Sequence, residues 1–205
     1  MGGEEGFKAK VVSEALGEFE ARILPLLEST SDETKRFLLF IAWLNGFLES
    51  RGLGRIVITG GFAVEVYTGR VYRTMDVDVI ADNCAEYVEG FLERFSEKIG
   101  RGYLPRYEVL VLKSIDVVSS AYKRRRNPVE LSVNGYKVYL DPVEDLVAVY
   151  LSGWKYWGST EDRDKALWLL ATWLDKIDAE YLKATCEEKG VLDKLEELLN
   201  VVKTM

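Results

Sequence analysis

Two aspartates in a β-rich segment are the residues of this chain whose types and spacing best fit a chemical role. The segment reads Met75-Asp76-Val77-Asp78-Val79-Ile80, and residues two apart on a strand point to the same face. The Asp76 and Asp78 carboxylates are therefore expected side by side, with Cα atoms roughly 6.6 Å apart. Carboxylate oxygens suit hard divalent cations, and acids on a buried strand are costly unless paired or metal-bound. An exposed edge strand is the alternative explanation.

A pair of adjacent glycines, Gly60 and Gly61, precedes this segment. The pair follows the apolar run Arg55-Ile56-Val57-Ile58-Thr59, and a helical pattern follows it over roughly 62–69. Free backbone N–H groups at the start of a helix can bind a phosphate, although a tight turn would also explain two glycines. The chain has no GxxxxGK[ST] P-loop, and no dinucleotide-binding glycine motif follows a strand. Together, the glycines and the acids indicate a site for a metal-bound nucleoside triphosphate.

The composition excludes several kinds of site. The chain contains no histidine, which rules out Ser-His-Asp and Cys-His triads and zinc sites with histidine ligands. Any catalysis must rely on carboxylates, Lys, Arg, Tyr, Ser or Thr, or on a cation held by oxygens. The net charge of −7 argues against general binding of nucleic acid by the whole surface.

The composition also bears on location. The two cysteines, Cys84 and Cys186, form no CxxC pair, no apolar stretch approaches the ~20 residues of a membrane span, and no signal peptide is visible. We therefore expect a protein of the reducing cytoplasm with no membrane partner. The absence of Gln and the many Glu, Lys and Arg residues resemble thermophile usage.

The pattern of apolar and turn residues predicts an α+β fold. Helices are expected over 7–28, disturbed by Pro25, from the capping box at 30–33 to about 51, over 62–69, over 84–98 with Asn83 as its cap, and over 142–156, 161–175, 178–188 and 190–203. Strands are expected over 55–59 and 75–80, from 107 through 118, and at 129–133 and 136–140 around the hairpin turn Asn134-Gly135.

These elements predict a mixed central sheet with helices packed on it, followed by a C-terminal helical segment. At 205 residues the chain has the size of one domain or two small ones. We place the division at residue 141: an α/β core with N-terminal helices over 1–141, and a helical segment packed on that core over 142–205.

The glycine pair and the acids carry a family resemblance. Gly60-Gly61-Phe62-Ala63 followed by Arg73-Thr74-Met75-Asp76-Val77-Asp78 resembles the core motif of the nucleotidyltransferase superfamily typified by DNA polymerase beta. The branch with GG-x-A and R-[ST]-x-D-x-D includes abortive-infection toxin nucleotidyltransferases. The strong match covers about 20 residues, and a looser match in element order extends to about residue 170.

The resemblance implies a mechanism and a set of site residues. In such proteins two acids, here Asp76 and Asp78, hold Mg²⁺ (or Mn²⁺) on a triphosphate, and a third acid on a later strand completes the site. The reaction is a two-metal in-line displacement that transfers a nucleotide and releases pyrophosphate. Asp116, which interrupts an apolar β run, is the preferred third acid, and Glu130 is the alternative.

The nucleotide contacts come from the same motifs. The resemblance implies that Gly60 and Gly61 support the triphosphate, that Thr74 belongs to the nucleotide-binding residues, and that Arg73 contacts phosphate or orients a site carboxylate. A plain surface position is the alternative explanation for Arg73.

The chain departs from the family pattern downstream. Where relatives usually carry a Lys after the Asp141-Pro142 turn, this chain has Tyr150, with Lys155 five residues on. Relatives often show R-x-K-D-x-x-D; Arg163 and Lys165 survive here, while Ala166 and Leu169 replace the two later acids.

Two functions are consistent with this pattern, and a third explanation is structural. The first is a Mg²⁺-dependent nucleotidyltransferase that moves a nucleotide from an NTP to a hydroxyl of an RNA (such as a tRNA) or of a protein. The second is an inactive binding module on the same fold, as one half of a toxin–antitoxin pair with a cognate antitoxin. The third is a helical scaffold with an incidental acidic strand.

A basic run, Lys123-Arg124-Arg125-Arg126, has two interpretations. It is either a solvated loop, which is common for such runs, or a clamp for a triphosphate or an RNA backbone.

Overall fold

The computed structural model describes residues 2–204, with side chains described from Glu5 to Thr204. The chain divides into two compact units. The first, which we call the sheet unit, comprises residues 1–59, 74–123 and 128–140. The second, the helical unit, comprises residues 60–73, 124–127 and 141–205. The single division that we expect at residue 141 stays a prediction.

The sheet unit is built from α1 (Gly2–Glu18), the π-helical turn η1 (Phe19–Ile23), α2 (Leu24–Glu28), α3 (Glu33–Glu49), β1 (Arg55–Ile58), β2 (Asp76–Asp82), α5 (Ala85–Phe95), β3 (Ser96–Ile99), β4 (Gly102–Pro105), the 3₁₀ turn η2 (Glu108–Leu110), β5 (Ser114–Ser119), β6 (Val129–Val133) and β7 (Tyr136–Leu140). The helical unit is built from α4 (Gly60–Tyr67), α6 (Val143–Trp157), α7 (Thr160–Trp173), α8 (Ala179–Glu188) and α9 (Leu192–Val202).

The strands form one mixed sheet in the order β3-β4-β5-β2-β1-β7-β6. β1 pairs antiparallel with β2 and parallel with β7. β2 also pairs parallel with β5. The mixed α+β architecture is therefore as predicted, and the strand that carries Asp76 and Asp78 lies inside the sheet rather than at its edge.

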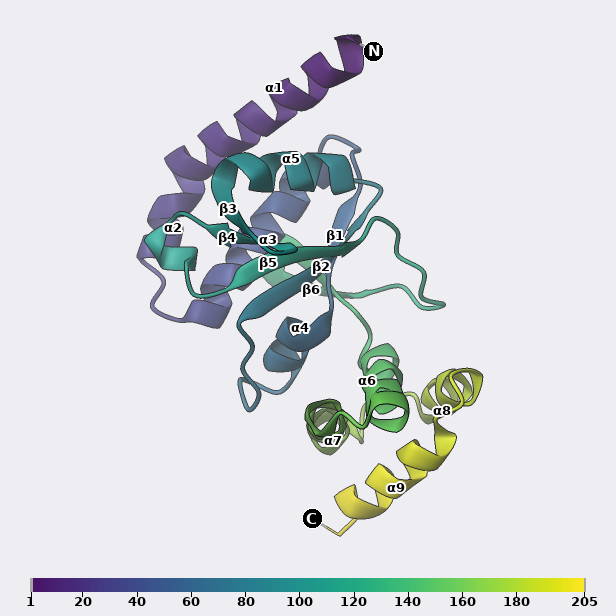
Figure 1. The fold of residues 1–205 in the computed structure, drawn as a ribbon. Helices are drawn as coiled ribbons and strands as arrows, with labels where there is room; N and C mark the ends of the chain where they lie inside the picture. Colours follow the sequence, from purple (N-terminus) through teal and green to yellow (C-terminus); the bar gives the residue numbers. More distant parts are fainter. Residues whose placement is uncertain (1, 205) are drawn as a thin grey trace. The chain divides into compact units, whose positions relative to one another are not determined.

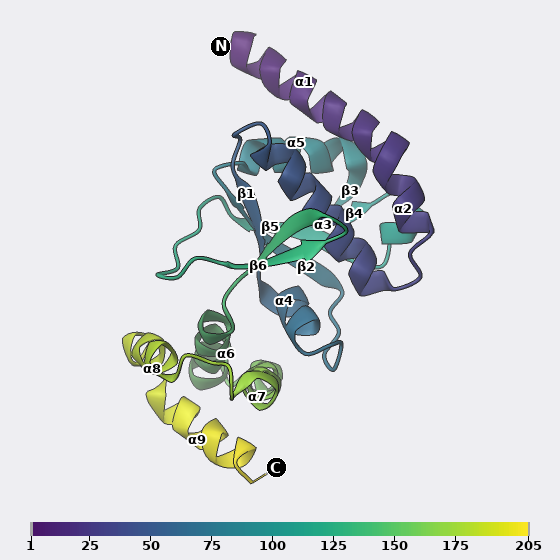
Figure 2. The same cartoon turned by 180° about the vertical axis from the view of Figure 1, so that it is seen from behind.

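Helices cover one face of this sheet in the sheet unit. α3 packs on β1 and β7, and α5 packs on β2, β4 and β5. The two helices meet through Phe40 and Phe95, whose stacked rings lie 5.0 Å apart, so both lie on the same face. α1 lies on the outer side of α5 (Figures 1 and 2). Phe19, in the π-helical turn, completes this aromatic core through an edge contact with Phe95.

The apolar pattern explains these positions. In α5 the buried residues include Val88, Phe91, Leu92 and Phe95, as the helical spacing predicts. The hairpin of β6 and β7 is also as predicted: Asn134 and Gly135 have φ angles of 52° and 83°, the left-handed values that a two-residue hairpin turn requires.

The segment after α5 is different from the prediction. Residues 107–112 were expected to begin a strand, but they contain only the short 3₁₀ turn η2. The strands β3 and β4, which the pattern missed, form a hairpin just before it. β3 exposes three of its four residues, so it lacks the apolar run on which strand prediction depends.

Two helix starts also differ from the prediction. The cap of α3 is Asp32, whose carboxylate accepts the backbone N–H of Lys35 at 2.8 Å. With this cap the third helical residue is Lys35, whereas a capping box needs a Glu or Gln there. The expected capping box is therefore not formed. Asn83 does not cap α5, which has Cys84 at its N-cap. Asn83 instead adopts a left-handed φ of 60°, which asparagine tolerates better than most residues.

In the helical unit, the four C-terminal helices lie close to the predicted ranges. Gly158 and Gly190 both have φ of 66° and follow α6 and α8 closely. Tyr67 of α4 donates its hydroxyl to the Asp141 carbonyl at 3.0 Å. The indole N–H of Trp173 donates to the Tyr67 carbonyl at 2.8 Å. Across the part of the chain that the structure describes, every helix is too short or too polar to cross a membrane.

Candidate metal and nucleotide site

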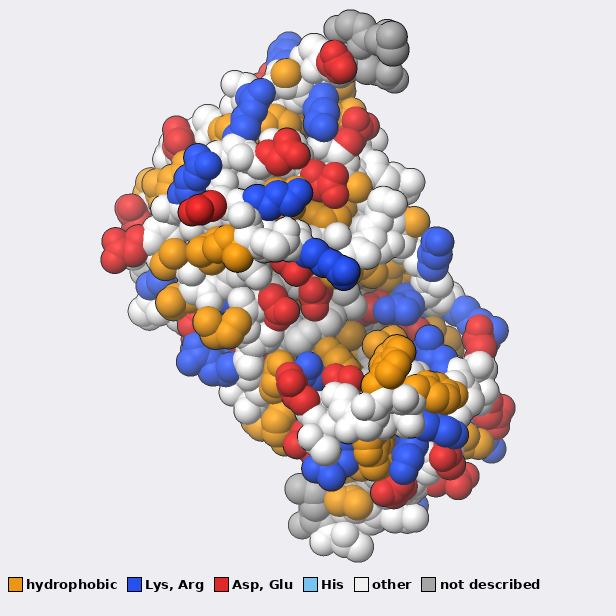
Figure 3. All heavy atoms as spheres, in the orientation of Figure 1, with side chains coloured by type: hydrophobic (Ala, Val, Ile, Leu, Met, Phe, Trp, Pro, Cys, Tyr) orange, Lys and Arg blue, Asp and Glu red, His pale blue; other side chains and the backbone are white. Residues whose placement is uncertain are grey.

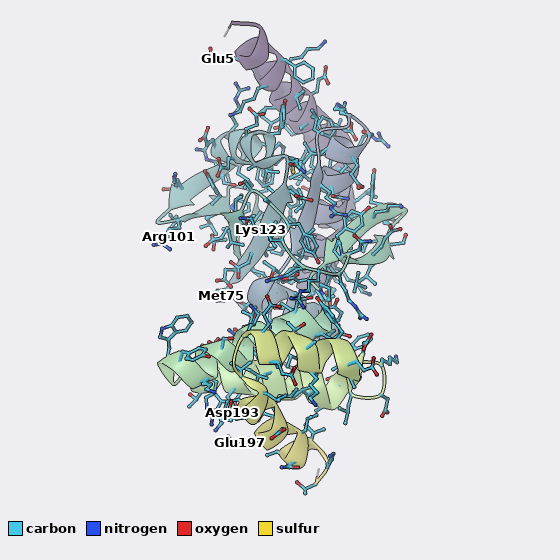
Figure 4. All side chains as sticks on the ribbon, turned by 90° about the vertical axis from the view of Figure 1, so that its right-hand side faces the viewer. Glu5, Met75, Arg101, Lys123, Asp193 and Glu197 are labelled. Atoms are coloured by element: carbon cyan, nitrogen blue, oxygen red, sulfur yellow. The ribbon has the colours of Figure 1, made fainter. Side chains whose placement is uncertain are left out.

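The register of β2 and β5 places the predicted acids on neighbouring strands. Asp78 pairs with Asp116, and Asp76 pairs with Ser114. Because register partners on adjacent strands share a face, the two strands carry Asp76, Asp78 and Asp116 on one face. On β2, the intervening Val77 and Val79 are fully buried, as expected for the opposite face, which the helices cover. Figure 4 labels Met75, the residue directly before Asp76.

The sheet order separates the two candidates for the third acid. Asp116 lies on β5, next to β2, whereas Glu130 lies on β6, beyond β1 and β7. Glu130 is exposed, and its carboxylate pairs with Lys137 across the hairpin at 3.1 Å. The geometry therefore favours Asp116 as the partner of Asp76 and Asp78.

A glycine on the far side of β5 makes room for the Asp116 carboxylate. β4 pairs with β5 through Tyr103 and Ile115, which places Gly102 opposite Asp116. A Cβ atom added to Gly102 would lie 2.0 Å from the Asp116 Oδ1 atom and 3.2 Å from the Ser114 Cβ atom. Only a glycine leaves the carboxylate in its present position. Nothing in the sequence marks Gly102 for this role, because the segment Gly100-Arg101-Gly102 resembles an ordinary turn; Arg101 is labelled in Figure 4.

The Asp116 carboxylate is only partly satisfied. Its Oδ1 atom is buried, and it has no hydrogen-bond partner among the described residues. Burial, and to a smaller extent the negative charge of Asp76, raise the pKa of Asp116 above its ordinary value. A buried oxygen without a donor is costly, and a positive ligand would offset that cost.

The Asp76 carboxylate is contacted by Thr74, two residues earlier in the chain. The Thr74 hydroxyl donates to the Asp76 Oδ1 atom, and Thr74 itself is buried. Its neighbour Arg73 is exposed and belongs to the helical unit. Thr74 therefore contacts one of the candidate carboxylates, and its expected part in nucleotide binding stays a prediction.

The donor set fits a hard divalent cation in chemical type. Asp76, Asp78 and Asp116 supply carboxylate oxygens, which Mg²⁺ and Mn²⁺ prefer, and the buried Oδ1 atom of Asp116 is a vacant acceptor. The acids do not form a closed cluster as they stand: among the side chains from Glu5 to Thr204, no three His, Cys, Asp or Glu residues are grouped closely enough to hold a metal ion.

The glycine pair begins a helix. Gly60 and Gly61 are the first two residues of α4, so the helix begins two residues earlier than predicted, and Gly60 has a left-handed φ of 61°. In the sheet unit, the preceding residue Thr59 donates its backbone N–H to the Asp78 carbonyl at 3.0 Å.

The downstream departures lie in the helical unit. Tyr150, Ala166 and Leu169 are all buried, so the positions where relatives carry a lysine and two acids serve packing here. The surviving Lys165 ion-pairs with Glu161 at 2.9 Å. Its ammonium also lies 5.1 Å from the centre of the Tyr150 ring.

The arginines of the basic run form ion pairs inside the helical unit. Arg124 forms a bidentate pair with the fully buried Asp141, at 2.7 Å for the shortest contact. Arg125 pairs with Glu188 at 2.9 Å, and Arg126 contacts Glu144 and Asp178. Arg125, whose pair with Glu188 is exposed, agrees with the solvated-loop interpretation, whereas Arg124 is engaged with a buried carboxylate. Lys123, labelled in Figure 4, is exposed.

Comparison with known proteins defines the class of fold. No protein-family model matches the chain, and no curated protein matches it. Its structure is similar to the crystal structure of an antigenic nucleotidyltransferase-like protein from Paracoccidioides brasiliensis, with a TM-score of 0.55 and 20% identity over 85% of this chain and 94% of that chain. The chain therefore has a nucleotidyltransferase-like fold.

Two structures of the antibiotic-resistance factor ANT(2'')-Ia overlap less well. The solution structure gives a TM-score of 0.46 and 17% identity over 78% of this chain and 94% of that chain. The crystal structure in complex with adenylyl-2''-tobramycin gives a TM-score of 0.47 and 15% identity over 75% of this chain and 95% of that chain. Both scores are below 0.5, so the fold rests on the first comparison.

Proposed function

We propose that this protein is a divalent-cation-dependent nucleotidyltransferase that moves a nucleotide from an NTP to a hydroxyl of an RNA or a protein. The observation that carries the proposal is the pairing of Asp78 with Asp116 on adjacent parallel strands, with Asp76 on the same face. The nucleotidyltransferase-like fold supports it.

In this proposal Asp76, Asp78 and Asp116 hold Mg²⁺ or Mn²⁺, which supplies charge neutralisation for the triphosphate and the attacking hydroxyl. Asp116 is the residue that would accept the proton of that hydroxyl. Thr74 orients Asp76. Gly60 and Gly61, at the start of α4, support the triphosphate through backbone N–H groups, and Arg73 adds a positive charge.

Of the two acceptor classes, a protein hydroxyl agrees better with the charges of the molecule. The net charge is −7, and Arg124, Arg125 and Arg126 are engaged with acidic partners. On the face seen in Figure 3, basic and acidic side chains are interspersed rather than gathered into a basic patch. Binding to an RNA backbone depends on such a patch.

The test uses α-labelled NTPs with Mg²⁺ or Mn²⁺, and total RNA or a protein extract from the native host as acceptor. We expect label transfer by the natural chain, and a loss of at least 100-fold in Asp76→Asn and in Asp78→Asn, because each removes a charge that holds the cation. Glu130→Gln, which removes an acid of the same sheet three strands away from β2, serves as the matched control and should retain transfer. Unchanged transfer by the Asp76→Asn/Asp78→Asn double variant would contradict the proposal.

A second candidate is an inactive binding module on the same fold, acting as one half of a toxin–antitoxin pair. The burial of Ala166 and Leu169, where relatives carry acids, favours it. Calorimetry of the pure protein with each of the four Mg²⁺-NTPs distinguishes the two candidates. A nucleotidyltransferase should give heat of binding with at least one of them. No heat with any of the four would support the inactive binding module.

A further inference from the structure

A single lysine is buried at the base of the strand that carries Asp116. Lys113 directly precedes β5, and its side chain is 1% exposed. A buried ammonium is costly unless it is paired and hydrogen-bonded. The partners that satisfy it therefore show what the fold gains from keeping a charge at this position.

Lys113 joins two segments of the sheet unit that are far apart in the sequence. Its ammonium lies 3.3 Å from the Glu33 carboxylate, in the first turn of α3. It also donates a hydrogen bond to the backbone carbonyl of Thr74. The next residues along the two segments are also hydrogen-bonded, since the Ser114 N–H donates to the Met75 carbonyl at 3.0 Å.

Thr74 is the link between this lysine and the candidate site. Its carbonyl accepts from Lys113, while its hydroxyl donates to the Asp76 carboxylate. The contacts form a chain that runs from Glu33 through Lys113 and Thr74 to Asp76. Because α3 is packed on the sheet by its buried face, this chain ties the carboxylate to a rigid element.

We propose that Lys113 is a positioning residue, which acts through Thr74 to hold the Asp76 carboxylate in the orientation that binds a divalent cation. This inference rests on the proposed function, because it assigns Asp76 to a cation site. It adds a residue outside the motifs that the resemblance covers, and one that does not touch the cation or the nucleotide.

The test measures Mn²⁺ affinity of the full chain by the electron paramagnetic resonance signal of free Mn²⁺. Mutation of a residue that hydrogen-bonds to a metal ligand typically lowers metal affinity by about 10–100-fold. We expect Lys113→Met to raise the Kd for Mn²⁺ about tenfold, Thr74→Val to raise it by a similar factor, and Glu33→Gln to raise it about threefold. Lys137→Met, the same substitution at an exposed hairpin position of the same unit, should leave the Kd unchanged.

A double-mutant cycle separates positioning from general loss of structure. If Lys113 acts through Thr74, the Lys113→Met/Thr74→Val protein should lose little more affinity than either single variant, whereas independent effects would multiply. Multiplied effects would overturn the inference. So would a folded Lys113→Met with the natural affinity, and if that variant does not fold, an unchanged affinity in Glu33→Gln would do the same.

The two proposals fail in different ways. If Asp76→Asn weakens Mn²⁺ binding and Lys113→Met does not, the cation site stands and the positioning role is wrong. If Asp76→Asn and Asp78→Asn leave Mn²⁺ binding unchanged, the cation site itself is wrong, and the role of Lys113 falls with it.

Discussion

At the scale of single residues, Asp116 is held in a state that costs the apo protein free energy. Its Oδ1 atom is buried without a donor, and Asp76 adds a like charge that helps to raise its pKa. Structural acids usually show the opposite arrangement, with partners that favour the charged form. Such uncompensated carboxylates concentrate at functional sites, where a ligand supplies the missing charge.

The raised pKa predicts a pH dependence of cation binding. Because the cation needs the ionised carboxylate, Mn²⁺ affinity should fall as the pH drops through the raised pKa of Asp116, and thus at a higher pH than an ordinary aspartate would dictate. Asp78→Asn should lower the overall affinity but retain this pH dependence, whereas Asp76→Asn should shift it to lower pH, because the repulsion is removed. A Mn²⁺ titration between about pH 4 and pH 8 measures it.

The same shift has a consequence for stability, with a defined sign. The folded state keeps the Asp116 proton to a higher pH than the unfolded chain does, so the metal-free protein should lose stability as the pH rises from the ordinary aspartate pKa through the raised one. Asp116→Asn should abolish that loss and raise the apo melting temperature near neutral pH while it weakens Mn²⁺ binding. A lower apo melting temperature in this variant would contradict the assignment.

At the scale of elements, the site depends on strands that the sequence reveals to different degrees. β2 could be predicted because Val77, Val79 and Ile80 form an apolar run, and the hairpin of β6 and β7 because Asn134-Gly135 has one preferred turn. β3 and β4 could not, because β3 is mostly exposed and its four residues are too few for a pattern. The role of Gly102 depends on a register between β4 and β5 that no local pattern contains.

Lys113 shows a related limit. A lone lysine between two apolar runs is a weak signal of a buried charge, but its partners Glu33 and Thr74 lie 80 and 39 positions earlier in the chain. Only the packing of α3 on the sheet brings the three together. The mutual placement of Asp76 and Asp78, in contrast, was predictable because residues two apart on one strand share a face.

The close approach at β4 predicts the effect of a single methyl group. Gly102→Ala should destabilise the protein by about 1–3 kcal/mol, as overpacking does, and should displace the Asp116 carboxylate and weaken Mn²⁺ binding. Urea denaturation and the Mn²⁺ titration measure the two effects. Gly17→Ala, in α1 with no atom within 4 Å of the added Cβ, is the control and should be neutral or slightly stabilising. A Gly102→Ala protein with natural stability and natural Mn²⁺ affinity would contradict the role of Gly102 in making room for the Asp116 carboxylate.

At the scale of the whole molecule, the three adjacent arginines of the basic run are engaged in ion pairs with acids of the helical unit. The arginines that stand together in the sequence bind acids of α6 and α8, or the residues that flank them, in the helical unit. With a net charge of −7, the protein repels nucleic acid at long range. A small substrate neutralised by a cation avoids that repulsion, which is consistent with a metal-bound NTP as the ligand.

Two neighbouring arginines allow a buried ion pair to be compared with an exposed one. Arg124→Met should lower the free energy of unfolding by about 3 kcal/mol, because it leaves the fully buried Asp141 carboxylate without its partner. Arg125→Met should change it by less than about 0.5 kcal/mol, because its pair with Glu188 is exposed. Urea denaturation of both variants checks this. If the two substitutions change the free energy of unfolding equally, the buried pair stabilises the fold no more than the exposed one.

The parallel pairing of β2 with β5, and of β1 with β7, also sets the order in which the molecule can be made. Asp78 and Asp116 are 38 residues apart in the sequence, and Val57 pairs with Tyr139, so the centre of the sheet needs strands from both ends of the sheet unit. Long-range pairing of this kind is slow, because loop closure precedes any gain from contact. During synthesis, a chain that has emerged only to β4 already contains Asp76 and Asp78 but not Asp116, so the three candidate carboxylates can come together only when translation has passed β5.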